Sequence, residues 1–342
     1  MELCVIYGDG IGREVVPAAV RVLLTLLPET IVHEADAGWE FFQANGTPLP
    51  EETIALAKSC GAVLFGAAAS PPYPVDGYFV PGVRLRRELQ TYANLRPTRY
   101  LPVPTAREGV NLVVVRENTE DLYAGQEHTE DEGRTGIAEK VITRAATERV
   151  ARKTYELAML TNRRRVTIVH KASVLQQSDG LFRRVALEIA EQYPDIITDE
   201  LLVDTAAYWM VKDPTRFDVI LTPNLYGDIL SDMAAAWGGG LGLAPSLNIG
   251  DEVAIAEPVH GCAPDIAGKG IANPTAAILS VALLLRHHWR RRDLARKIEA
   301  AVREALQEGS YTADIHAYGA LSTEAFTERV CANLERLKHV EI

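Results

Sequence analysis

The sequence predicts an α/β fold with a largely parallel sheet. Short apolar runs alternate with longer amphipathic segments along most of the chain, which is the pattern of strands connected by helices. The length of 342 residues is ample for a large core and indicates two domains or one elaborated domain. The sequence holds no internal repeat and no low-complexity tract, so a solenoid or a disordered chain is not expected.

The elements follow from the period and length of the apolar segments. Apolar runs of strand length occur at residues 3–8, 61–67, 110–117, 165–172 and 217–224. Amphipathic helical patterns occupy 14–27, 147–160, 179–193 and 324–337, and a strongly apolar helix is expected at 271–288. Residues 70–82, rich in Pro and Gly, are expected to form a loop, and residues 238–251 form a turn-rich stretch.

Composition excludes several classes of partner. The net charge of −11 argues against nucleic acid and against an anionic membrane surface. The four cysteines are scattered without C-x-x-C spacing, which argues against a zinc site or a disulfide framework. The apolar runs are too short to span a bilayer, and the first residues enter a strand pattern without a basic and apolar leader. A cytoplasmic location is expected.

The segment 217–232 carries the most informative acidic pair. It is expected to form a buried strand, a tight turn and the start of a helix, with Asp228 and Asp232 on one helix face. Like charges at this spacing repel each other, and a divalent cation would convert the repulsion into binding. A solvated acidic face is the alternative. Asp204 ends a further expected strand at 200–204.

Two glycine-rich segments differ in what they predict. Residues 7–15 read YGDGIGREV, whose spacing is G-x-G-x-G rather than the dinucleotide fingerprint G-x-G-x-x-G, and a tight strand-to-helix turn is preferred. Residues 257–274 combine small residues with one His and one Asp. Small residues allow adenine and pyrophosphate to approach main-chain N–H groups, although a plain glycine-rich loop is the alternative.

Three arginines lie near the ends of elements, at Arg86, Arg96 and Arg116. The planar guanidinium suits bidentate binding of carboxylates, whereas a single surface arginine more often only solubilises a protein. Tyr123 and Lys171 follow expected strand ends, where an α/β sheet usually presents active-site groups. A half-buried packing residue and a solvated strand end are their alternative interpretations.

Taken in order, the motifs resemble a known family. GDGIG, YANLRP, VRENTEDLYAG, HKAS, NLYGDILSD and EPVHGCAPDIAGKGIANP are similar to those of the metal-dependent, β-decarboxylating hydroxyacid dehydrogenases. That family includes the isocitrate, homoisocitrate, 3-isopropylmalate and tartrate/D-malate dehydrogenases. The resemblance runs from about Leu3 to the C-terminal helix.

The resemblance implies an isopropylmalate/isocitrate dehydrogenase-like α/β fold rather than a standard Rossmann fold. Two α/β domains would surround a mixed sheet. Residues 1–97 and 250–342 would form a large, discontinuous NAD-binding domain. Residues 98–249 would form a small domain that carries dimerisation and the metal and substrate sites. The expected assembly is a homodimer or tetramer with shared active sites.

The resemblance also assigns catalytic and metal-binding roles. Asp228 and Asp232 of one subunit, with Asp204 of the other, would hold Mg²⁺ or Mn²⁺. Lys171 from the partner subunit would be the general base, and Tyr123 would be the acid that protonates the enolate. In this chemistry the cation lowers the pKa of the substrate hydroxyl, hydride leaves for NAD⁺, and the β-keto acid loses CO₂.

The remaining implied residues bind substrate and cofactor. The substrate-binding set is Ser70, Arg86, Arg96, Arg116, Tyr123, Lys171 and Ser173. The cofactor-binding set is Ala68, Ala69, Ser70, Ser173, His260, Gly261, Cys262, Ala263, Pro264, Asp265, Ile266 and Asn273.

The same comparison favours NAD and a particular substrate. Asp265 and Ile266 stand where NADP enzymes place basic or phenolic groups, and a carboxylate would repel a 2′-phosphate. Residues 117–120 read ENTE rather than the E-L-T-G-G of isopropylmalate enzymes, and 80–89 lack the Ser and Asn of isocitrate enzymes. R-R-E-L resembles homoisocitrate dehydrogenases of lysine biosynthesis. Homoisocitrate is the expected substrate, with isocitrate, tartrate/D-malate and 3-isopropylmalate as alternatives.

Three departures from the family pattern leave the fine specificity open: Ser173 in place of Asn, Trp209 in place of Gln, and Cys262 in place of Ser. A silent regulatory subunit would be expected to lack a metal aspartate, Lys171 or Tyr123, yet all are present. A plain NAD-binding module would leave the arginine and aspartate sets unexplained. The polar stretch 126–136 is too long for a tight turn and is expected to be an extension that contacts a second subunit.

Overall fold

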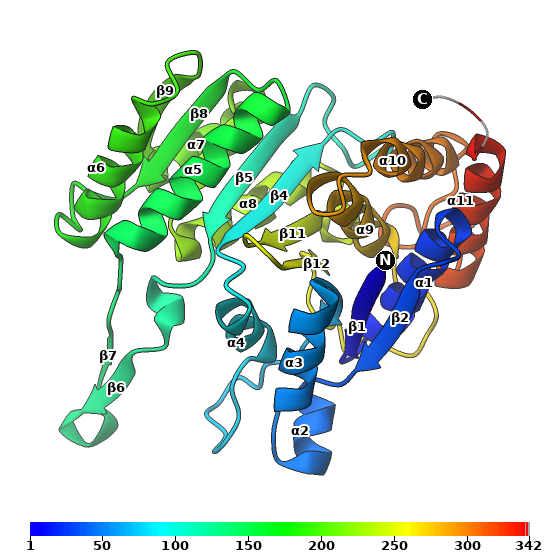
Figure 1. The fold of residues 1–342 in the computed structure, drawn as a ribbon, viewed down its shortest axis with the longest axis horizontal. Helices are drawn as coiled ribbons and strands as arrows, with labels where there is room; N and C mark the ends of the chain where they lie inside the picture. Colours follow the sequence, from blue (N-terminus) through cyan, green and yellow to red (C-terminus); the bar gives the residue numbers. More distant parts are fainter. Residues whose placement is uncertain (339, 341–342) are drawn as a thin grey trace. The chain divides into compact units, whose positions relative to one another are not determined.

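The computed structural model describes residues 1–338 and 340, and the chain divides into two compact units (Figure 1). The first unit comprises residues 1–91, 100–108 and 235–342. The second comprises residues 92–99 and 109–234. The chain therefore passes between the units several times. The roles expected for a large NAD-binding domain and a small dimerisation domain stay predictions.

The sheet of the first unit has the strand order β2-β1-β3-β12-β11. The strands are β1 (Glu2–Gly8), β2 (Ile31–Ala35), β3 (Ala62–Ala67), β11 (Pro245–Ile249) and β12 (Ala254–Pro258). All neighbours are parallel except β11 and β12, which are antiparallel. The helices are α1 (Gly12–Leu26), α2 (Trp39–Asn45), α3 (Glu51–Cys60), α4 (Pro81–Glu88), α9 (Thr275–His287), α10 (Arg292–Gln307) and α11 (Thr323–Leu337).

The side chains of β1 point alternately to the two faces of the sheet and contribute to the core on both sides. Cys4 and Ile6 of β1 belong to a buried cluster with Ile54 of α3 and Leu85 of α4. Because successive strand residues point to opposite faces, the other residues of β1 face the layer that contains α1 and α9. Helix α9 is buried along nearly its whole length, as the strongly apolar run 271–288 predicts.

The sheet of the second unit has the strand order β4-β5-β10-β8-β9. The strands are β4 (Ala93–Arg99), β5 (Asn111–Glu117), β8 (Arg165–His170), β9 (Ile197–Leu202) and β10 (Val219–Thr222). Only β4 and β5 pair antiparallel. The helices are α5 (Arg144–Leu160), α6 (Ser178–Ala190), α7 (Val203–Lys212) and α8 (Asn224–Trp237). The antiparallel pairings make the architecture mixed.

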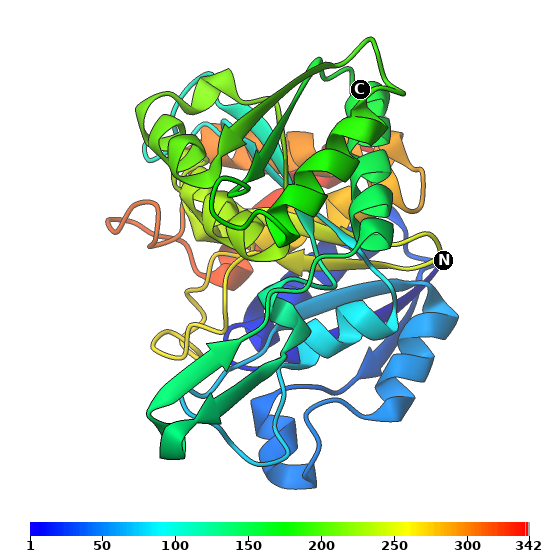
Figure 2. The ribbon, with the colours of Figure 1, turned by 90° about the vertical axis from the view of Figure 1, so that its left-hand side faces the viewer.

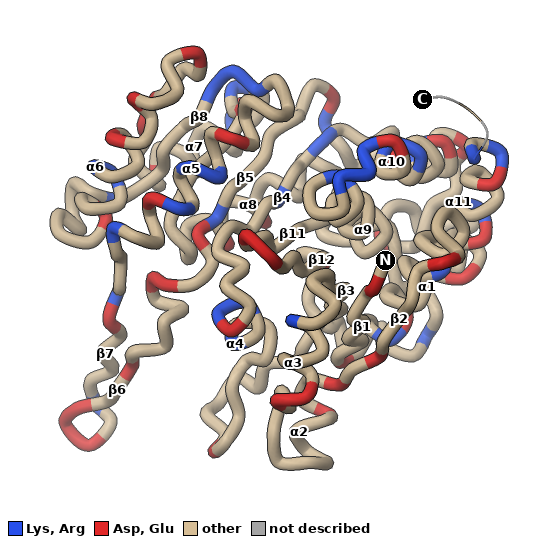
Figure 3. Tube along the Cα trace, in the orientation of Figure 1, with Lys and Arg blue, Asp and Glu red and all other residues tan. Residues whose placement is uncertain are grey.

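The polar stretch 126–136 forms a β-hairpin. β6 (Glu127–Glu130) and β7 (Thr135–Ala138) pair antiparallel, and nearly all of their side chains are exposed. Figure 2 shows the hairpin extending away from the helices of its own unit, and Figure 3 shows acidic residues at its tip. An isolated two-stranded hairpin is only marginally stable in water. Its expected contact with a second subunit stays a prediction.

The structure confirms the strands expected at 3–8, 61–67, 110–117, 165–172 and 217–224, the five expected helices and the loop after residue 70. Two expectations were wrong. Residues 238–251 include strand β11, and Asp204 lies in the first turn of α7 rather than at the end of a strand. Among the described residues, no helix is both long and apolar enough to cross a membrane.

Candidate active site

The acidic pair lies on α8 in the second unit. Strand β10 is fully buried and ends at Thr222, and α8 begins at Asn224. Asp228 and Asp232 are one turn apart on this helix, with side chains 35% and 53% exposed. The pair therefore lies at the carboxyl end of a central strand, where open α/β sheets bind their ligands.

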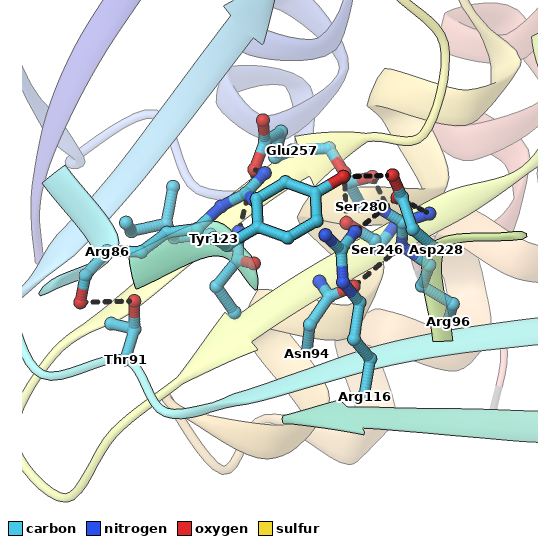
Figure 4. A network of polar contacts seen from close by, with 12 residues as sticks. Arg86, Thr91, Asn94, Arg96, Arg116, Tyr123, Asp228, Ser246, Glu257 and Ser280 are labelled. Atoms are coloured by element: carbon cyan, nitrogen blue, oxygen red, sulfur yellow. Dashed lines mark hydrogen bonds and ion pairs between the residues drawn. The ribbon is translucent and has the colours of Figure 1, made fainter. Parts of the chain in front are cut away.

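Two arginines face this pair from neighbouring strands. Arg116 near the end of β5 is almost fully buried, donates to Asn224 Oδ1 over 2.8 Å and forms an ion pair with Asp228. Arg96 on β4 places Nη1 3.1 Å from Asp228 Oδ1 and 3.5 Å from Asp232 Oδ1. Figure 4 shows both guanidinium groups turned toward Asp228. The structure thus brings together two of the three predicted arginines.

Arg96 is held in place by neutral partners. Its Nε donates to Asn94 Oδ1 over 2.6 Å, and its Nη1 donates to Ser231 Oγ over 2.7 Å. A guanidinium held in this way keeps a fixed direction, which is what bidentate recognition of a carboxylate requires. Sequence reasoning missed Asn94 and Ser231, although both stand within motifs that it singled out.

Tyr123 converges on the same carboxylate. Its hydroxyl donates to Asp228 Oδ2 over 2.6 Å, and the Arg116 guanidinium lies 4.8 Å from its ring centroid. Burial raises the pKa of Tyr123, Arg116 opposes this shift, and the hydrogen bond to Asp228 adds to it. The side chain is therefore a neutral phenol near pH 7, so its proton is available for transfer.

The acidic pair fits a hard divalent cation. Desolvation raises the pKa of Asp232, Arg96 opposes the shift, and the negative charge of Asp228 adds to it. A cation would relieve this mutual repulsion, and carboxylate oxygens are the donors that Mg²⁺ and Mn²⁺ prefer. Within one protomer, no group of three ligand atoms among the described residues includes Asp204 or the α8 pair. A third ligand from a second subunit stays a prediction.

Lys171 and Asp204 form a separate pair within the chain. Lys171 directly follows β8, Asp204 lies in α7 directly after β9, and the two parallel strands end side by side. Lys171 Nζ forms an ion pair with Asp204, and this hydrogen bond holds the pKa of that carboxyl below its ordinary value. The base and the third metal ligand that the sequence predicts are thus neighbours in one protomer.

Gly227 allows α8 to pack closely against the side chain of Arg116. A Cβ atom on Gly227 would lie 2.6 Å from the Cβ and Cγ atoms of Arg116 and 3.1 Å from Thr222 Cγ2. Only a residue without a side chain permits this approach. A glycine inside a helical pattern, four residues from Ser231, was the sequence signal for a close contact.

Arg86 belongs to the first unit. It lies on α4 and forms an ion pair of 2.7 Å with Glu257, and both side chains are largely buried (Figure 4). Asn248 Nδ2 donates to the same Glu257 oxygen over 2.8 Å. The structure therefore pairs the third predicted arginine with a carboxylate that the sequence analysis did not single out.

The first glycine-rich segment is a tight turn, as expected. Gly8 and Gly10 have φ values of +71° and +56°. Cβ atoms there would lie 1.9 Å from the Ala67 carbonyl oxygen and 2.1 Å from the Cys262 carbonyl oxygen. Ile11 N donates to the Cys262 oxygen over 2.9 Å. The turn thus anchors the loop at 257–274.

Asp9, inside this turn, orders two further segments. Its buried carboxylate accepts hydrogen bonds from the backbone N–H groups of Trp39, Glu40 and Ala69 at 2.7, 3.0 and 2.8 Å. Ala69 is one of the residues expected near nicotinamide, together with the partly buried Ala68 and the exposed Ser70. Ser173 in the second unit is also exposed. The contacts expected of these residues with nicotinamide stay predictions.

The loop 257–274 offers polar groups to a ligand. His260 Nδ1 lies 2.9 Å from the Gly261 carbonyl oxygen, whereas its Nε2 is buried without a hydrogen-bond partner. Burial lowers the pKa of His260, so the ring is neutral. Asn273 Nδ2 donates to Asp314 over 3.0 Å, and its Oδ1 accepts from Thr275 N at the start of α9.

The rest of this loop is open to solvent. Pro264 and Asp265 are exposed, and Cys262, Ala263 and Ile266 are partly exposed. Ala263 has a φ of +39°, which is uncommon for a residue with a side chain. A solvent-open, small-residue loop with one buried, unpartnered imidazole nitrogen fits the adenosine end of a nicotinamide cofactor.

Comparison with known proteins identifies relatives along the whole chain. Residues 2–330 match the family described as isocitrate/isopropylmalate dehydrogenase. The chain is 51% identical over 337 residues to the isocitrate/homoisocitrate dehydrogenase of Thermus thermophilus, which covers 98% of this chain and 99% of that protein. It is 48% identical over 335 residues to the 3-isopropylmalate/3-methylmalate dehydrogenase of Methanocaldococcus jannaschii, covering 96% and 97%.

A solved structure confirms the expected fold. The crystal structure of isocitrate dehydrogenase from Methylococcus capsulatus matches with a TM-score of 0.94 and 42% sequence identity, covering 97% of this chain and 99% of that chain. Together with the mixed pairing of the strands, this match confirms the predicted isopropylmalate/isocitrate dehydrogenase-like α/β fold.

Proposed function

The chain belongs to the isocitrate/isopropylmalate dehydrogenase family of decarboxylating hydroxyacid dehydrogenases, and we propose that it converts homoisocitrate to 2-oxoadipate with NAD. The observation that carries this proposal is the convergence of Arg96, Arg116 and Tyr123 on Asp228. This cluster combines donors for substrate carboxylates, an acid and a carboxylate ligand for a cation.

Arg96 and Arg116 bind the substrate's carboxylates in this proposal. Both guanidinium groups are nearly buried, so the hydrogen bonds that they make are shielded from water. Their present contacts with Asp228 balance the charge of the site. A carboxylate-rich substrate takes over some of these donors, while Asn94 and Asn224 continue to hold the Nε atoms.

Asp228 and Asp232, with Asp204 of a second subunit, would hold Mg²⁺ or Mn²⁺. When bound, the cation acidifies the substrate hydroxyl and stabilises the enolate that decarboxylation leaves. The metal-dependent character of the family supports this assignment.

Lys171 and Tyr123 carry the two proton transfers. Lys171 of the second subunit, as the neutral amine, accepts the proton of the substrate hydroxyl as hydride passes from the same carbon to the nicotinamide ring, and it releases that proton to solvent at the end of the turnover. The carbon–carbon bond to the β-carboxylate then breaks, and CO₂ leaves. Tyr123 donates its phenolic proton to the carbon that lost CO₂, which suits its raised pKa and neutral state. Solvent returns the proton to Tyr123.

NAD is the proposed cofactor. Asp265 is exposed on the loop that would receive the adenosine ribose, so its carboxylate is free to accept a ribose hydroxyl and would repel a 2′-phosphate. Kinetics with NAD and NADP test this assignment. Asp265→Asn is expected to raise kcat/KM for NADP relative to NAD, and a wild-type preference for NADP would contradict the assignment.

Homoisocitrate is the proposed substrate because helix α4 presents Val83 rather than Ser or Asn beside Arg86. The Thermus thermophilus relative is named for both isocitrate and homoisocitrate, so isocitrate is the second candidate. Steady-state kinetics with homoisocitrate, isocitrate, 3-isopropylmalate and D-malate test the choice. The highest kcat/KM for 3-isopropylmalate would contradict the interpretation of residues 117–120, which read ENTE.

A homodimer, or a tetramer built from it, located in the cytoplasm, completes the proposal. Large apolar side chains remain exposed on α7 and α8, where Tyr208, Val211 and Ile229 are 56%, 61% and 53% exposed. Exposed apolar surface of this kind marks interaction sites. Sedimentation equilibrium tests the assembly, and a stable, active monomer would contradict it.

A further inference from the structure

A buried ion cluster lies at the base of the β-hairpin, outside the residues assigned above. Lys140, two residues after β7, places Nζ 3.0 Å from Asp121 Oδ1 and 3.1 Å from Asp179 Oδ1. Both aspartate side chains are 0% exposed, and the lysine side chain is 11% exposed. The ammonium also lies 4.2 Å from the Tyr226 ring centroid. One ammonium group is thus the counter-ion of two fully buried carboxylates.

Asp121 holds two backbone segments, the one that leads into Tyr123 and the first turn of α8. Its Oδ1 accepts a hydrogen bond from Leu122 N over 2.8 Å, and its Oδ2 accepts from Leu225 N over 2.9 Å. Leu122 directly precedes Tyr123, and Leu225 lies in the first turn of α8, three residues before Asp228. Asp121 therefore fixes the acid and the helix of the acidic pair relative to each other.

Asp179 holds the backbone at Lys171, the proposed general base. It lies in the first turn of α6, and its Oδ2 accepts a hydrogen bond from Lys171 N over 2.6 Å. The same side chain offers its other oxygen to Lys140. The segment after β8 is partly or fully exposed. This charge-assisted hydrogen bond therefore restrains the backbone position of Lys171.

Asp121 also has a strained backbone. Its φ is +73° and its ψ is −149°, a region that residues with side chains rarely occupy. Its N–H donates to the Val141 carbonyl oxygen over 2.8 Å, directly beside Lys140. Such a conformation persists only where its surroundings over-determine it. The contacts from residues 140 and 141 provide that restraint.

We propose that Lys140 is a positioning residue that places Tyr123 and Lys171 for their proton transfers, an inference that rests on the proposed function. Without its ammonium, two buried carboxylates repel each other and lose their counter-ion. The amides of Leu122, Lys171 and Leu225 then lose fixed acceptors. Since Lys140 lies two residues after the end of the hairpin, the same contact links the hairpin to both proton-transfer groups.

Hydrogen exchange and kinetics on Lys140→Met test this proposal. Exchange is expected to become faster in peptides that contain the amides of Leu122, Lys171 and Leu225, because their acceptors lose the counter-ion that holds them. kcat is expected to fall about 100-fold, the effect of a misplacement near 1 Å. KM for NAD should change little, because the loop that would bind adenosine lies in the first unit.

Two further variants act as controls. Lys153→Met makes the same change on α5, where Lys153 Nζ lies 4.0 Å from exposed Glu156, and it should leave exchange and kcat unchanged. Lys140→Arg keeps the charge and should retain more activity than Lys140→Met. If Lys140→Met does not fold, Lys140→Gln, which keeps hydrogen-bond donors, takes its place in both measurements.

The two proposals fail in different ways. Unchanged exchange at the three amides, in a folded Lys140 variant, would overturn the positioning role, whatever the substrate is. Exchange that rises while kcat stays at the wild-type value would overturn it as well. A wild-type protein without activity on any of the four acids would overturn the proposed function, and the exchange result would still decide the role of Lys140.

Discussion

The Tyr123 hydroxyl donates a 2.6 Å hydrogen bond to Asp228 Oδ2, while Asp228 Oδ1 faces Arg96 and Arg116. One carboxylate thus connects the predicted acid, two predicted substrate ligands and the predicted metal site. A ligand that engages Asp228 therefore also changes the hydrogen bonding of Tyr123. In the proposed function, this coupling would bring substrate, cation and proton donor to a single cluster of the second unit.

Replacing Tyr123 by Phe should remove the proton donor and leave the ring. We expect kcat to fall about 100-fold or more, the usual contribution of a general acid, with a smaller change in KM. Tyr155→Phe is the matched control, because Tyr155 is a buried tyrosine of the same unit whose hydroxyl lies 2.9 Å from Thr198 Oγ1. Equal kcat values for wild type and Tyr123→Phe would exclude the assigned role.

Gly227→Ala should damage the site through packing. The new methyl group would lie 2.6 Å from Arg116 carbons, and overpacking of this kind costs about 1–3 kcal/mol. We expect a lower melting temperature and a raised KM for substrate. Gly180→Ala on α6 is the control, because its Cβ would meet only the end of the Arg184 side chain at 3.6 Å. A Gly227→Ala variant as active and stable as Gly180→Ala would refute the packing argument.

Glu120 should give the folded state a pH dependence. Burial raises the pKa of Glu120 to about 7 from an ordinary 4.5, although hydrogen bonds from Thr143 oppose the shift. Between these values the folded state binds more protons than the unfolded chain, so this contribution to stability falls as pH rises through the window. Glu120→Gln cannot ionise. Its melting temperature, relative to that of wild type, should therefore increase from pH 4.5 to pH 7.

Thermal unfolding of both proteins across this pH range checks the prediction. Other carboxylates titrate in both proteins, so the difference between the two melting temperatures isolates Glu120. A difference that stays constant with pH would show that the carboxyl titrates at its ordinary value in the folded protein.

The shared metal site predicts complementation between two inactive variants. Asp204→Asn and Asp228→Asn homodimers should each be inactive. After subunit exchange, half of the dimers are hybrids with one intact site, so about a quarter of wild-type activity should return. Exchange verified by mass spectrometry without recovered activity would indicate that Asp204 and Asp228 act within one chain or in different sites.

The sequence predicted the elements with strong periodicity and missed those without it. Strands β3, β5, β8 and β10 are near-continuous apolar runs, which only buried strands or helices produce. Strand β4 reads ANLRPTR and β11 reads PSLNI, so proline and polar residues conceal them. These two strands form because they pair with strands that are remote in sequence. A local sequence pattern contains no information about that pairing.

The site was predicted in the same uneven way. Motifs singled out Arg96, Arg116, Tyr123 and Asp228, and the structure brings these together. The supporting residues were missed, because the role of a buried Asp121 or Lys140 depends on partners far along the chain. Glu257 is of the same kind, since only the fold reveals its ion pair with Arg86.

The most direct test is the stoichiometry of the reaction with homoisocitrate. We predict that NADH and CO₂ form in equal amounts when Mg²⁺ is present, that both cease when a chelator removes the metal, and that Asp228→Asn forms neither. NADH formation without CO₂, or product formation that the chelator leaves unchanged, would contradict a metal-dependent oxidative decarboxylation at Asp228.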